Sequence, residues 1–302
     1  MKLLLCSDLD RTLIPNGNAP ESNAARALLR SLVERKILDV CYVSGRSVPL
    51  IRDAIGEFSL PSPQVVIGDV GATIADVTSD ANADANKHTN KQWQTWSAWH
   101  DHLAENWQGR DAWALKALLE PLTTRLGIRS QEDANQNTFK LSYYTPNPFD
   151  QTQLSVLEDT LQQHGFASRL IWSVDEAIDT GLLDVLPARA SKFHAIEFFL
   201  ARHPLGQHHS QNSVVFAGDS GNDLAALTSH LNAVLVANAA ADVREQAQHD
   251  VANEQTLYLA RGDFLEMNGN YSAGVLEGLA HYHPDLRNVM QTILADINTD
   301  SN

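Results

Sequence analysis

The sequence of 302 residues predicts a doubly wound α/β core with a mainly parallel sheet, interrupted by an inserted α+β domain. Short apolar runs alternate with helical patterns near both ends of the chain, as they do in βαβ units. The middle of the chain lacks this alternation and is rich in tryptophan. A stretch without large apolar residues, 78–90, lies between the first part and the middle and is typical of a linker.

Composition places the chain among ordinary globular proteins and excludes some partners. Hydrophobic residues make up 43% and charged residues 20% of the sequence. The formal net charge of −15 disfavours nucleic acid and anionic membrane surfaces. No stretch is long enough to span a membrane, and residues 1–5 are too short for a signal peptide, so we expect a cytoplasmic protein. Cys6 and Cys41 lie in separate apolar runs and are expected to be reduced and buried.

The first part of the core follows from apolar periodicity. The predicted elements are a strand at 3–6, a helix at 21–36, a strand at 37–43, a helix at 48–58, a strand at 65–67 and a turn at 68–71. In the first helix, apolar residues at 25, 28, 29, 32 and 33 fall on one face. Strand, helix and strand with short connections predict parallel strands joined by a right-handed crossover.

The middle of the chain predicts a small domain with an antiparallel sheet. Five tryptophans, at 93, 96, 99, 107 and 113, crowd into a region expected to be helical. Residues 138–144 alternate like a half-buried strand, 154–164 are helical, and 170–174 and 182–186 are further strands. The tryptophans are either core residues or platforms for a sugar ring, and aromatic residues at helical spacing are more often core.

The α/β pattern resumes near residue 191. The predicted elements are helix 192–202, strand 214–217, helix 224–229, strand 233–236, helix 241–248, strand 257–259, helix 272–282 and a helical pattern at 289–297. We therefore expect residues 1–85 and 188–302 to form the core and residues 86–187 to form the inserted domain.

Two carboxylates two residues apart follow the first strand, in the segment SDLDRTL at 7–13. Asp8 and Asp10 would repel each other unless a cation or a shared proton compensates. Considered alone, the pair is equally compatible with a solvated acidic turn. Three further polar sites also follow or adjoin predicted core segments: Ser44, Lys192 and the pair Asp219 and Asp223. In an open parallel sheet, ligands bind at the carboxyl ends of the strands, so we expect these sites to meet.

The chemistry of this set fits phosphoryl transfer. Asp8 can attack phosphorus and form an acyl phosphate, and Asp10 can act as acid and then base if its neighbours raise its pKa. Asp8 and Asp219, with a backbone carbonyl and Asp223 in support, supply the hard oxygen ligands that Mg²⁺ prefers. Lys192 supplies a fixed cation for the phosphoryl group.

The ordered segments resemble the four motifs of the haloacid dehalogenase (HAD) phosphatase superfamily. They are DLDRTL at 8–13, SGR at 44–46, Lys192 and GDSGND at 218–223. The insertion lies between Ser44 and Lys192, which resembles the subclass with a type-II cap. The resemblance implies a Rossmann-like HAD core, a Mg²⁺ cofactor and an aspartyl-phosphate intermediate. It implies that Asp8, Asp10 and Lys192 are catalytic, and that the metal ligands are Asp8, Asp10, Asp219 and Asp223.

Within that subclass, the chain is most similar to bacterial sucrose-6-phosphate phosphatases. The similarity rests on the tryptophan-rich opening of the insertion, KLSY at 140–143, DVLP at 184–187 and AGVLEGLAHY at 273–282. It implies hydrolysis of sucrose 6-phosphate, a small sugar phosphate, as the last step of sucrose synthesis, and a functional association with a sucrose-phosphate synthase. The implied phosphate- and substrate-binding residues are Ser44, Gly45, Arg46, Lys140 and Asn222.

Several positions leave alternatives open. Many relatives carry Asn where Arg11 stands, Thr where Ser44 stands, and a small hydroxyl residue or Asn where Asp69 stands. Arg11 could pair with a surface carboxylate. Lys140 could contact sugar or point to solvent, and Arg46 could contact the cap or pair near the start of its helix.

Two other functions also fit the sequence. Related phosphatases for mannosylfructose-phosphate, trehalose-phosphate or hexose phosphates share the same frame. A non-catalytic sugar-phosphate-binding module with this fold would be expected to have lost at least one of Asp8, Asp10, Lys192 and Asp219, and all four are present.

Overall fold

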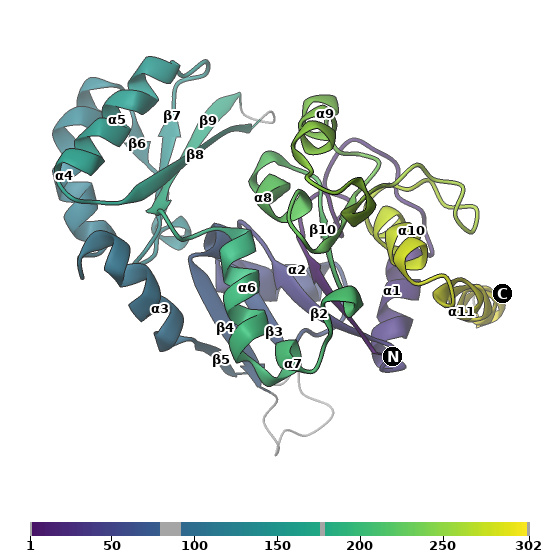
Figure 1. Cartoon of the computed structure of the whole chain (residues 1–302). Coiled ribbons are helices and arrows are strands. Elements are labelled where there is room, and N and C mark those ends of the chain that lie inside the picture. The colour runs from purple at the N-terminus through teal and green to yellow at the C-terminus, as the bar shows by residue number, and fades with distance from the viewer. Residues whose placement is uncertain (1, 79–91, 176–178, 301–302) are drawn as a thin grey trace.

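The computed structural model describes residues 2–78, 92–175 and 179–300, which form two sheets with helices around them (Figure 1). The larger sheet has eight strands. In spatial order they are β12 (Leu257–Leu259), β11 (Asn232–Leu235), β10 (Val214–Gly218), β1 (Leu3–Ser7), β2 (Leu38–Val43), β3 (Val65–Gly68), β4 (Thr73–Thr78) and β5 (Gln92–Thr95). Neighbouring strands from β12 to β3 are parallel, whereas β4 and β5 are antiparallel additions. The predicted mainly parallel α/β core is confirmed.

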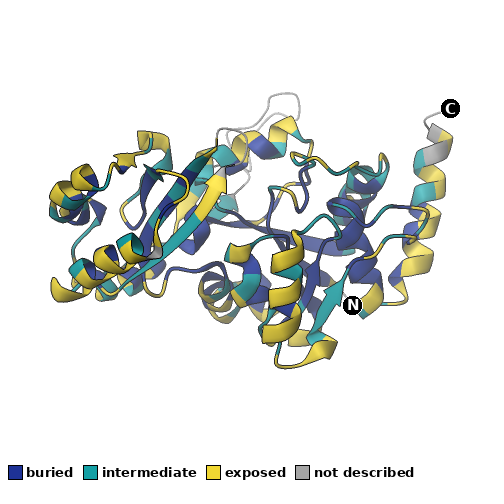
Figure 2. Ribbon diagram, turned by 90° about the horizontal axis from the view of Figure 1, so that it is seen from above, coloured by how far each residue is buried: buried dark blue, intermediate teal, exposed yellow. Residues whose placement is uncertain are grey.

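The two faces of the larger sheet are covered by different helices. Side chains alternate along a strand, so Leu3 and Leu5 of β1 pack in one apolar cluster, and Leu4 and Cys6 pack in the other. The first face carries α1 (Ala25–Glu34), α2 (Val48–Glu57), α10 (Ser272–Tyr282) and α11 (Leu286–Asp300). The second carries α6 (Lys192–Arg202), α7 (Pro204–Gln207), α8 (Leu224–Leu227) and α9 (Ala241–Asp250). Figure 2 shows the strands between them buried.

The smaller sheet is antiparallel, as predicted for the inserted domain. Its strands in spatial order are β6 (Arg129–Ser130), β7 (Leu141–Thr145), β9 (Thr180–Pro187) and β8 (Ser168–Asp175). The long helices α4 (Ala112–Arg125) and α5 (Gln151–Gln163) cover one face. On that face Leu141, Tyr143, Leu183 and Val185 are buried. For Leu141 and Tyr143 of β7, this agrees with the alternation that the sequence pattern at 138–144 predicted.

Three strands were not predicted: β4, β5 and the two-residue β6. β4 and β5 form an antiparallel pair in which Val77 lies opposite Trp93, so Trp93 is in a strand and not in a helix. Trp96 N–H also donates to the Ile74 carbonyl at 2.9 Å, which keeps residue 96 with the larger sheet. The expected linker falls largely on residues outside the described ones. We place the start of the inserted domain at α3 (Ser97–Ala104), because β5 pairs with the core.

The tryptophans divide into core and surface residues. Trp99 and Trp107 are fully buried, which confirms the core interpretation for these two. Trp99 Nε1–H donates to the Gly71 carbonyl at 3.0 Å, and Trp107 Nε1–H donates to Ser168 Oγ at 2.9 Å. Trp113 is 58% exposed. Within the described ranges, no helix combines the length and the apolar character needed to cross a membrane.

A tight turn, η1 (Asp69–Gly71), packs against the start of α6. Asp69, Val70 and Gly71 all have positive φ, at 55°, 58° and 97°. A Cβ on Gly71 would lie 2.3 Å from the backbone carbonyl of Ser191, the residue before Lys192. Glycine is therefore required here both for the backbone conformation and for the close approach of the two segments.

We predict that Gly71→Ala lowers the free energy of unfolding by about 3 kcal/mol, because overpacking and a left-handed alanine both cost energy. Chemical denaturation followed by circular dichroism measures this. Gly56→Ala in α2 is the matched control, since a Cβ there meets no atom within 4 Å. It should stabilise by at most about 1 kcal/mol. Equal effects of the two substitutions would contradict the packing described for η1.

Candidate active site

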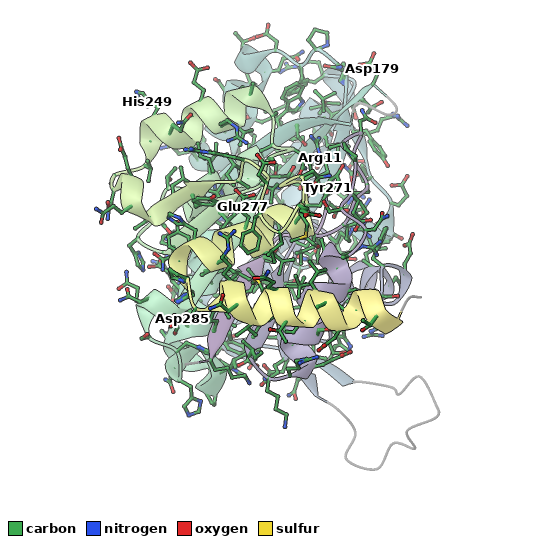
Figure 3. The ribbon with its side chains drawn as sticks, turned by 90° about the vertical axis from the view of Figure 1, so that its right-hand side faces the viewer. Arg11, Asp179, His249, Tyr271, Glu277 and Asp285 are labelled. Atoms are coloured by element: carbon green, nitrogen blue, oxygen red, sulfur yellow. The ribbon has the colours of Figure 1, made fainter. Side chains whose placement is uncertain are left out.

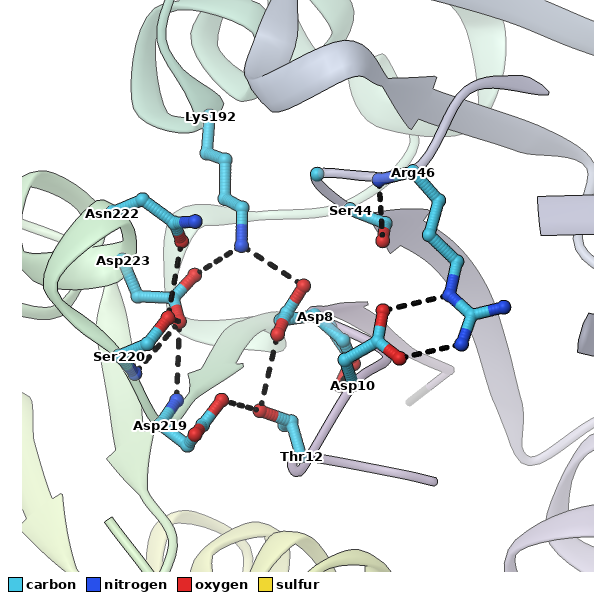
Figure 4. Close-up of polar contacts among 12 residues, drawn as sticks. Asp8, Asp10, Thr12, Ser44, Arg46, Lys192, Asp219, Ser220, Asn222 and Asp223 are labelled. Carbon is cyan, nitrogen blue, oxygen red and sulfur yellow. Dashed lines mark hydrogen bonds and ion pairs between the residues drawn. The ribbon is translucent and has the colours of Figure 1, made fainter. Parts of the chain in front are cut away.

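Polar side chains from four chain segments meet at one edge of the larger sheet (Figure 4). Asp8 follows β1, Ser44 follows β2 and Asp219 follows β10, and these three strands are parallel neighbours in the order β10, β1, β2. Their carboxyl ends must therefore lie together. Lys192, the first residue of α6, reaches the same place. The structure thus brings together Asp8, Lys192, Asp219 and Asp223, as the sequence predicted.

The Lys192 ammonium is the centre of this group. Its Nζ donates to Asp8 Oδ1 at 2.9 Å and to Asp223 Oδ1 at 2.7 Å, and the side chain is 1% exposed. Burial alone would lower the pKa of Lys192, but the Asp223 and Asp8 carboxylates outweigh it and raise the pKa well above its usual value. Lys192 is therefore charged, and it compensates part of the negative charge around it.

Asp223 is held by the turn that follows β10. Its Oδ2 accepts hydrogen bonds from the backbone N–H of Asp219 and from the N–H and hydroxyl of Ser220, each at 3.1 Å. A Cβ on Gly218 would lie 2.6 Å from Asp223 Cγ, so only glycine lets the carboxylate fold back against the strand end. The turn sequence therefore fixes the Asp223 carboxylate beside Asp219.

Thr12 links the two halves of the acidic group, and sequence reasoning gave it no role. Its hydroxyl donates to Asp219 Oδ1 at 3.0 Å and lies 3.5 Å from Asp8 Oδ2. The side chain is fully buried. The sequence could have indicated this role, because Thr12 closely follows Asp8 and Asp10 and a buried hydroxyl needs a hydrogen-bond acceptor.

The acidic group fits a divalent cation. Asp8, Asp219 and Asp223 each place a carboxylate oxygen within 4.8 Å of the others, and all three are buried. Three carboxylates face one ammonium, that of Lys192, and one guanidinium, that of Arg11, whose Nε lies 3.5 Å from Asp219 Oδ2, so negative charge remains in excess. Burial, with the other carboxylates, raises the pKa of Asp8 well above its usual range and that of Asp219 to about 7. A buried excess of carboxylate oxygens is the donor set that Mg²⁺ prefers.

Asp10 lies apart from that group, although it was expected among the metal ligands. Its carboxylate accepts two hydrogen bonds from Arg46, from Nε at 2.8 Å and from Nη2 at 2.6 Å, and one from Asn16 Nδ2 at 2.6 Å. These bonds raise the pKa of Arg46. The acidic group found among the described residues does not include the Asp10 carboxylate. Arg46 thus pairs with a carboxylate of another motif, which sequence spacing does not reveal.

The other predicted binding residues surround the group. Ser44 is fully buried, and its Oγ accepts the N–H of Arg46 at 3.2 Å. Asn222 is half-buried, and its Oδ1 accepts the hydroxyl of Ser220 at 3.2 Å. Lys140 comes from the inserted domain, and its Nζ donates to the Gly45 carbonyl at 3.4 Å. Lys140 is 5% exposed, so it does not point to solvent.

Arg11 pairs with a buried carboxylate and not with a surface one. Its Nε lies 3.5 Å from Asp219 Oδ2. The Arg11 carbonyl accepts from Asn238 Nδ2 at 2.7 Å, and Asn238 Oδ1 accepts the N–H of Tyr271 at 2.8 Å. Arg11 and Tyr271, labelled in Figure 3, both have positive φ. The departure from Asn at this position thus adds a cation beside the acidic group.

The family follows from comparison with known sequences. A family model described as sucrose-6F-phosphate phosphohydrolase matches residues 1–283. The chain belongs to this family. A HAD-like hydrolase of Nitrosococcus oceani is 47% identical over 294 residues, covering 96% of this chain and 74% of that protein. An Arabidopsis thaliana protein named "probable sucrose-phosphatase 3a" is 22% identical over 298 residues, and this chain spans 63% of its length.

Solved structures share the fold. The sucrose-phosphatase of Synechocystis sp. PCC6803, solved with sucrose and phosphate, matches with a TM-score of 0.69 at 24% identity, covering 94% of this chain and 99% of that one. A HAD-like hydrolase of Bacillus subtilis matches with a TM-score of 0.57 at 16% identity, covering 92% and 91%. At these identities the likeness establishes a HAD core with an inserted domain. Family membership supports a phosphatase that acts on a sugar phosphate.

The raised pKa of Asp219 predicts how the metal-free protein responds to pH. Because its folded-state pKa of about 7 exceeds the usual 3.8, the folded state binds more protons than the unfolded state between these values. The contribution of Asp219 to stability is therefore present at low pH and is lost as pH rises to about 7.

We predict that, in EDTA, the wild type loses stability relative to Asp219→Asn between pH 4 and pH 7. Calorimetric unfolding of both proteins across this range measures the difference. Added Mg²⁺ should raise the stability of the wild type most strongly above pH 7, because carboxylates bind a metal ion in their deprotonated form. A stability difference that does not change with pH would contradict the described burial of Asp219.

Proposed function

We propose that the protein is a Mg²⁺-dependent phosphatase that hydrolyses sucrose 6-phosphate to sucrose and phosphate through an aspartyl-phosphate intermediate. The single observation that carries the chemistry is the contact of Asp8 with Lys192 at the strand edge, beside Asp219 and Asp223. The match of residues 1–283 to the sucrose-6F-phosphate phosphohydrolase family supports the substrate. The Synechocystis sucrose-phosphatase was solved with sucrose and phosphate, which supports it further.

Asp8 is the proposed nucleophile. Lys192 holds one of its oxygens at 2.9 Å and Thr12 lies 3.5 Å from the other, so the carboxylate is fixed before substrate arrives. One Asp8 oxygen attacks phosphorus as the bond from phosphorus to the sugar oxygen breaks. Asp10 protonates that oxygen. Water then attacks phosphorus while Asp10 takes its proton, and the bond between phosphorus and the Asp8 oxygen breaks, which releases phosphate and regenerates the Asp8 carboxylate.

Asp10 must exchange partners to do this work. In the structure its two oxygens are occupied by Arg46 and Asn16, and the Asp10 and Arg46 side chains are 35% and 27% exposed. About a third of each side chain is in contact with solvent, which weakens the attraction between the two charges. An arriving phosphoryl group can therefore draw the Arg46 guanidinium to itself and free the Asp10 carboxylate. Arg46 would then bind substrate, as the sequence predicted.

Asp8, Asp219 and Asp223 are the residues that would hold Mg²⁺, because they leave an uncompensated buried negative charge. A bound divalent cation neutralises the carboxylates and the phosphate that must approach them. Ser44, Gly45 and Asn222 are the proposed partners of the phosphoryl oxygens, and Lys192 is the fixed cation on the other side. Asp10, which the sequence included among the ligands, is assigned to proton transfer instead.

The inserted domain is the proposed site of sugar recognition. Ser142, Ile171 and Asp184 lie opposite one another in the smaller sheet, on the face that α4 and α5 do not cover. Lys140 lies 3.9 Å from Asp184, so a cation and a carboxylate are available for sugar hydroxyls there. We place the enzyme in the cytoplasm, in functional association with a sucrose-phosphate synthase. Phosphatases for mannosylfructose-phosphate, trehalose-phosphate or hexose phosphates are the alternatives in the same reaction class.

A non-catalytic binding module is the alternative from another class. The contacts of Lys192 with Asp8 and Asp223 argue against it, because a module that only binds has no need of a buried, cation-fixed carboxylate at the sheet edge. Turnover distinguishes the two alternatives directly.

We predict that kcat/KM for sucrose 6-phosphate exceeds that for glucose 6-phosphate by at least about 100-fold. Glucose 6-phosphate lacks the second sugar ring, so the polar groups of the site that bind the hydroxyl groups of that ring would be left unpaired. Phosphate release by the purified protein with Mg²⁺, across sucrose, trehalose, mannosylfructose and hexose phosphates, measures this. Preference for another member of the panel would overturn the substrate assignment while keeping the reaction class. EDTA should abolish release and added Mg²⁺ should restore it; release that persists in EDTA would remove the metal from the account.

A further inference from the structure

Three consecutive backbone carbonyls, those of residues 44–46, all accept hydrogen bonds on one side of the loop that follows β2. The donors are Val70 N–H to Ser44 at 3.0 Å, Lys140 Nζ to Gly45 at 3.4 Å and Asp69 N–H to Arg46 at 2.8 Å. A trans peptide holds its N–H opposite its C=O. The N–H groups of Gly45 and Arg46 therefore point away from these donors, and the N–H of Arg46 donates to Ser44 Oγ at 3.2 Å, beside which the phosphoryl group is proposed to bind.

Only one of these three donors comes from the inserted domain. Lys140 immediately precedes β7, and its side chain is 7% exposed. The other two donors belong to η1, which is part of the core. The hydrogen bond from Lys140 to the Gly45 carbonyl therefore links the inserted domain to the loop at residues 44–46, where phosphate is proposed to bind.

Two carboxylates face the Lys140 ammonium. Asp184 Oδ1 lies at 3.9 Å, but Asp184 belongs to the same domain as Lys140 and already accepts the hydroxyl of Ser142. Asp69 Oδ1 lies at 4.0 Å and belongs to the core. Only the ion pair with Asp69 spans the two domains, whereas the pair with Asp184 orients Lys140 within its own.

Asp69 is an unusual residue for its place. It is 3% exposed, and its Oδ1 is buried without a hydrogen-bond partner among the described residues. Its Oδ2 accepts the Thr73 hydroxyl at 2.8 Å, and Asn137 of the inserted domain donates to that hydroxyl at 3.3 Å. Burial raises the pKa of Asp69, and the Lys140 charge opposes this. A carboxylate so placed is costly unless a cation faces it, and Lys140 is that cation.

We propose that Asp69 is a positioning residue whose carboxylate holds the Lys140 ammonium on the Gly45 carbonyl, so that the inserted domain and the phosphate-binding loop move together. The proposal rests on the proposed function only in that residues 44–46 bind phosphate. When the inserted domain moves away, the Gly45 carbonyl loses its donor and the peptide is free to turn. Phosphate is then bound well only when the two domains are joined.

Asp69→Asn tests this with little change of shape. Asparagine keeps the size of the side chain and tolerates the φ of 55°, but it removes the charge. We expect the affinity for inorganic phosphate with Mg²⁺, measured by calorimetry, to fall about tenfold. Lys140→Met, which removes the partner charge in the inserted domain, should lower the phosphate affinity by a similar factor. It provides the test if Asp69→Asn does not fold. The double variant should bind phosphate no more weakly than Lys140→Met alone.

A second readout follows the domains themselves. Spin labels at exposed positions 163 of α5 and 34 of α1 report the distance between the domains, and the buried Cys6 and Cys41 stay unlabelled. Asp69→Asn should broaden the distance distribution. Asp39→Asn is the matched control, because Asp39 is 7% exposed and pairs with Lys2 at 2.7 Å near the opposite end of β2. It should leave phosphate affinity and the distances unchanged.

Unchanged phosphate affinity in Asp69→Asn, or additive losses in the double variant, would overturn the proposal. A purely structural role for Asp69 predicts the second result, since stability would fall without coupling to Lys140. Neither readout depends on the sugar. If sucrose 6-phosphate is not preferred but the two variants are coupled, the substrate assignment fails and the positioning role of Asp69 stands.

Discussion

The Lys192 ammonium stabilises the buried carboxylates of Asp8 and Asp223 in a space from which water is largely excluded. Three carboxylates within 4.8 Å of one another repel strongly in such a space, and Lys192 binds two of them at 2.9 and 2.7 Å. Removing one partner of a buried ion pair costs about 3–5 kcal/mol, because it leaves an uncompensated charge. One ammonium still leaves an excess of negative charge. That excess is the physical reason for a divalent cation, and it is also what an anionic substrate must overcome.

The fold is arranged so that this contact can form. Asp8, Asp223 and Lys192 come from β1, the turn after β10, and the start of α6, which are adjacent only because the sheet is parallel and β10 lies beside β1. The turn η1 packs against Ser191 without a side chain on Gly71, and Trp99 bonds to the carbonyl of that glycine. In the division that we propose, the inserted domain begins at α3, which contains Trp99, and ends at β9, shortly before Lys192. Its position is therefore tied to the residues that hold the ammonium.

Much of the fold was predictable because it depends on local pattern. Helices 192–202 and 272–282 were predicted with the bounds that the structure has, since apolar residues at helical spacing are a local signal. Asp8 and Asp219 were predicted to meet because parallel strands share an edge. β4 and β5 were missed because their pairing joins segments on either side of the linker. The pairs of Asp10 with Arg46 and of Asp69 with Lys140 were missed for the same reason: no spacing along the chain reveals contacts that only the tertiary fold creates.

The central claim is that Asp8, held by Lys192, is the carboxylate that attacks phosphorus. The most direct measurement is to mix enzyme, Mg²⁺ and sucrose 6-phosphate, quench with acid during turnover, reduce with borohydride, and map the modified residue by peptide mass spectrometry. An aspartyl phosphate is reduced to homoserine, whereas a free carboxylate is not. The account predicts homoserine at position 8 alone, and none in Asp8→Asn. Homoserine at position 10, or no modified aspartate in a sample that releases phosphate, would contradict it.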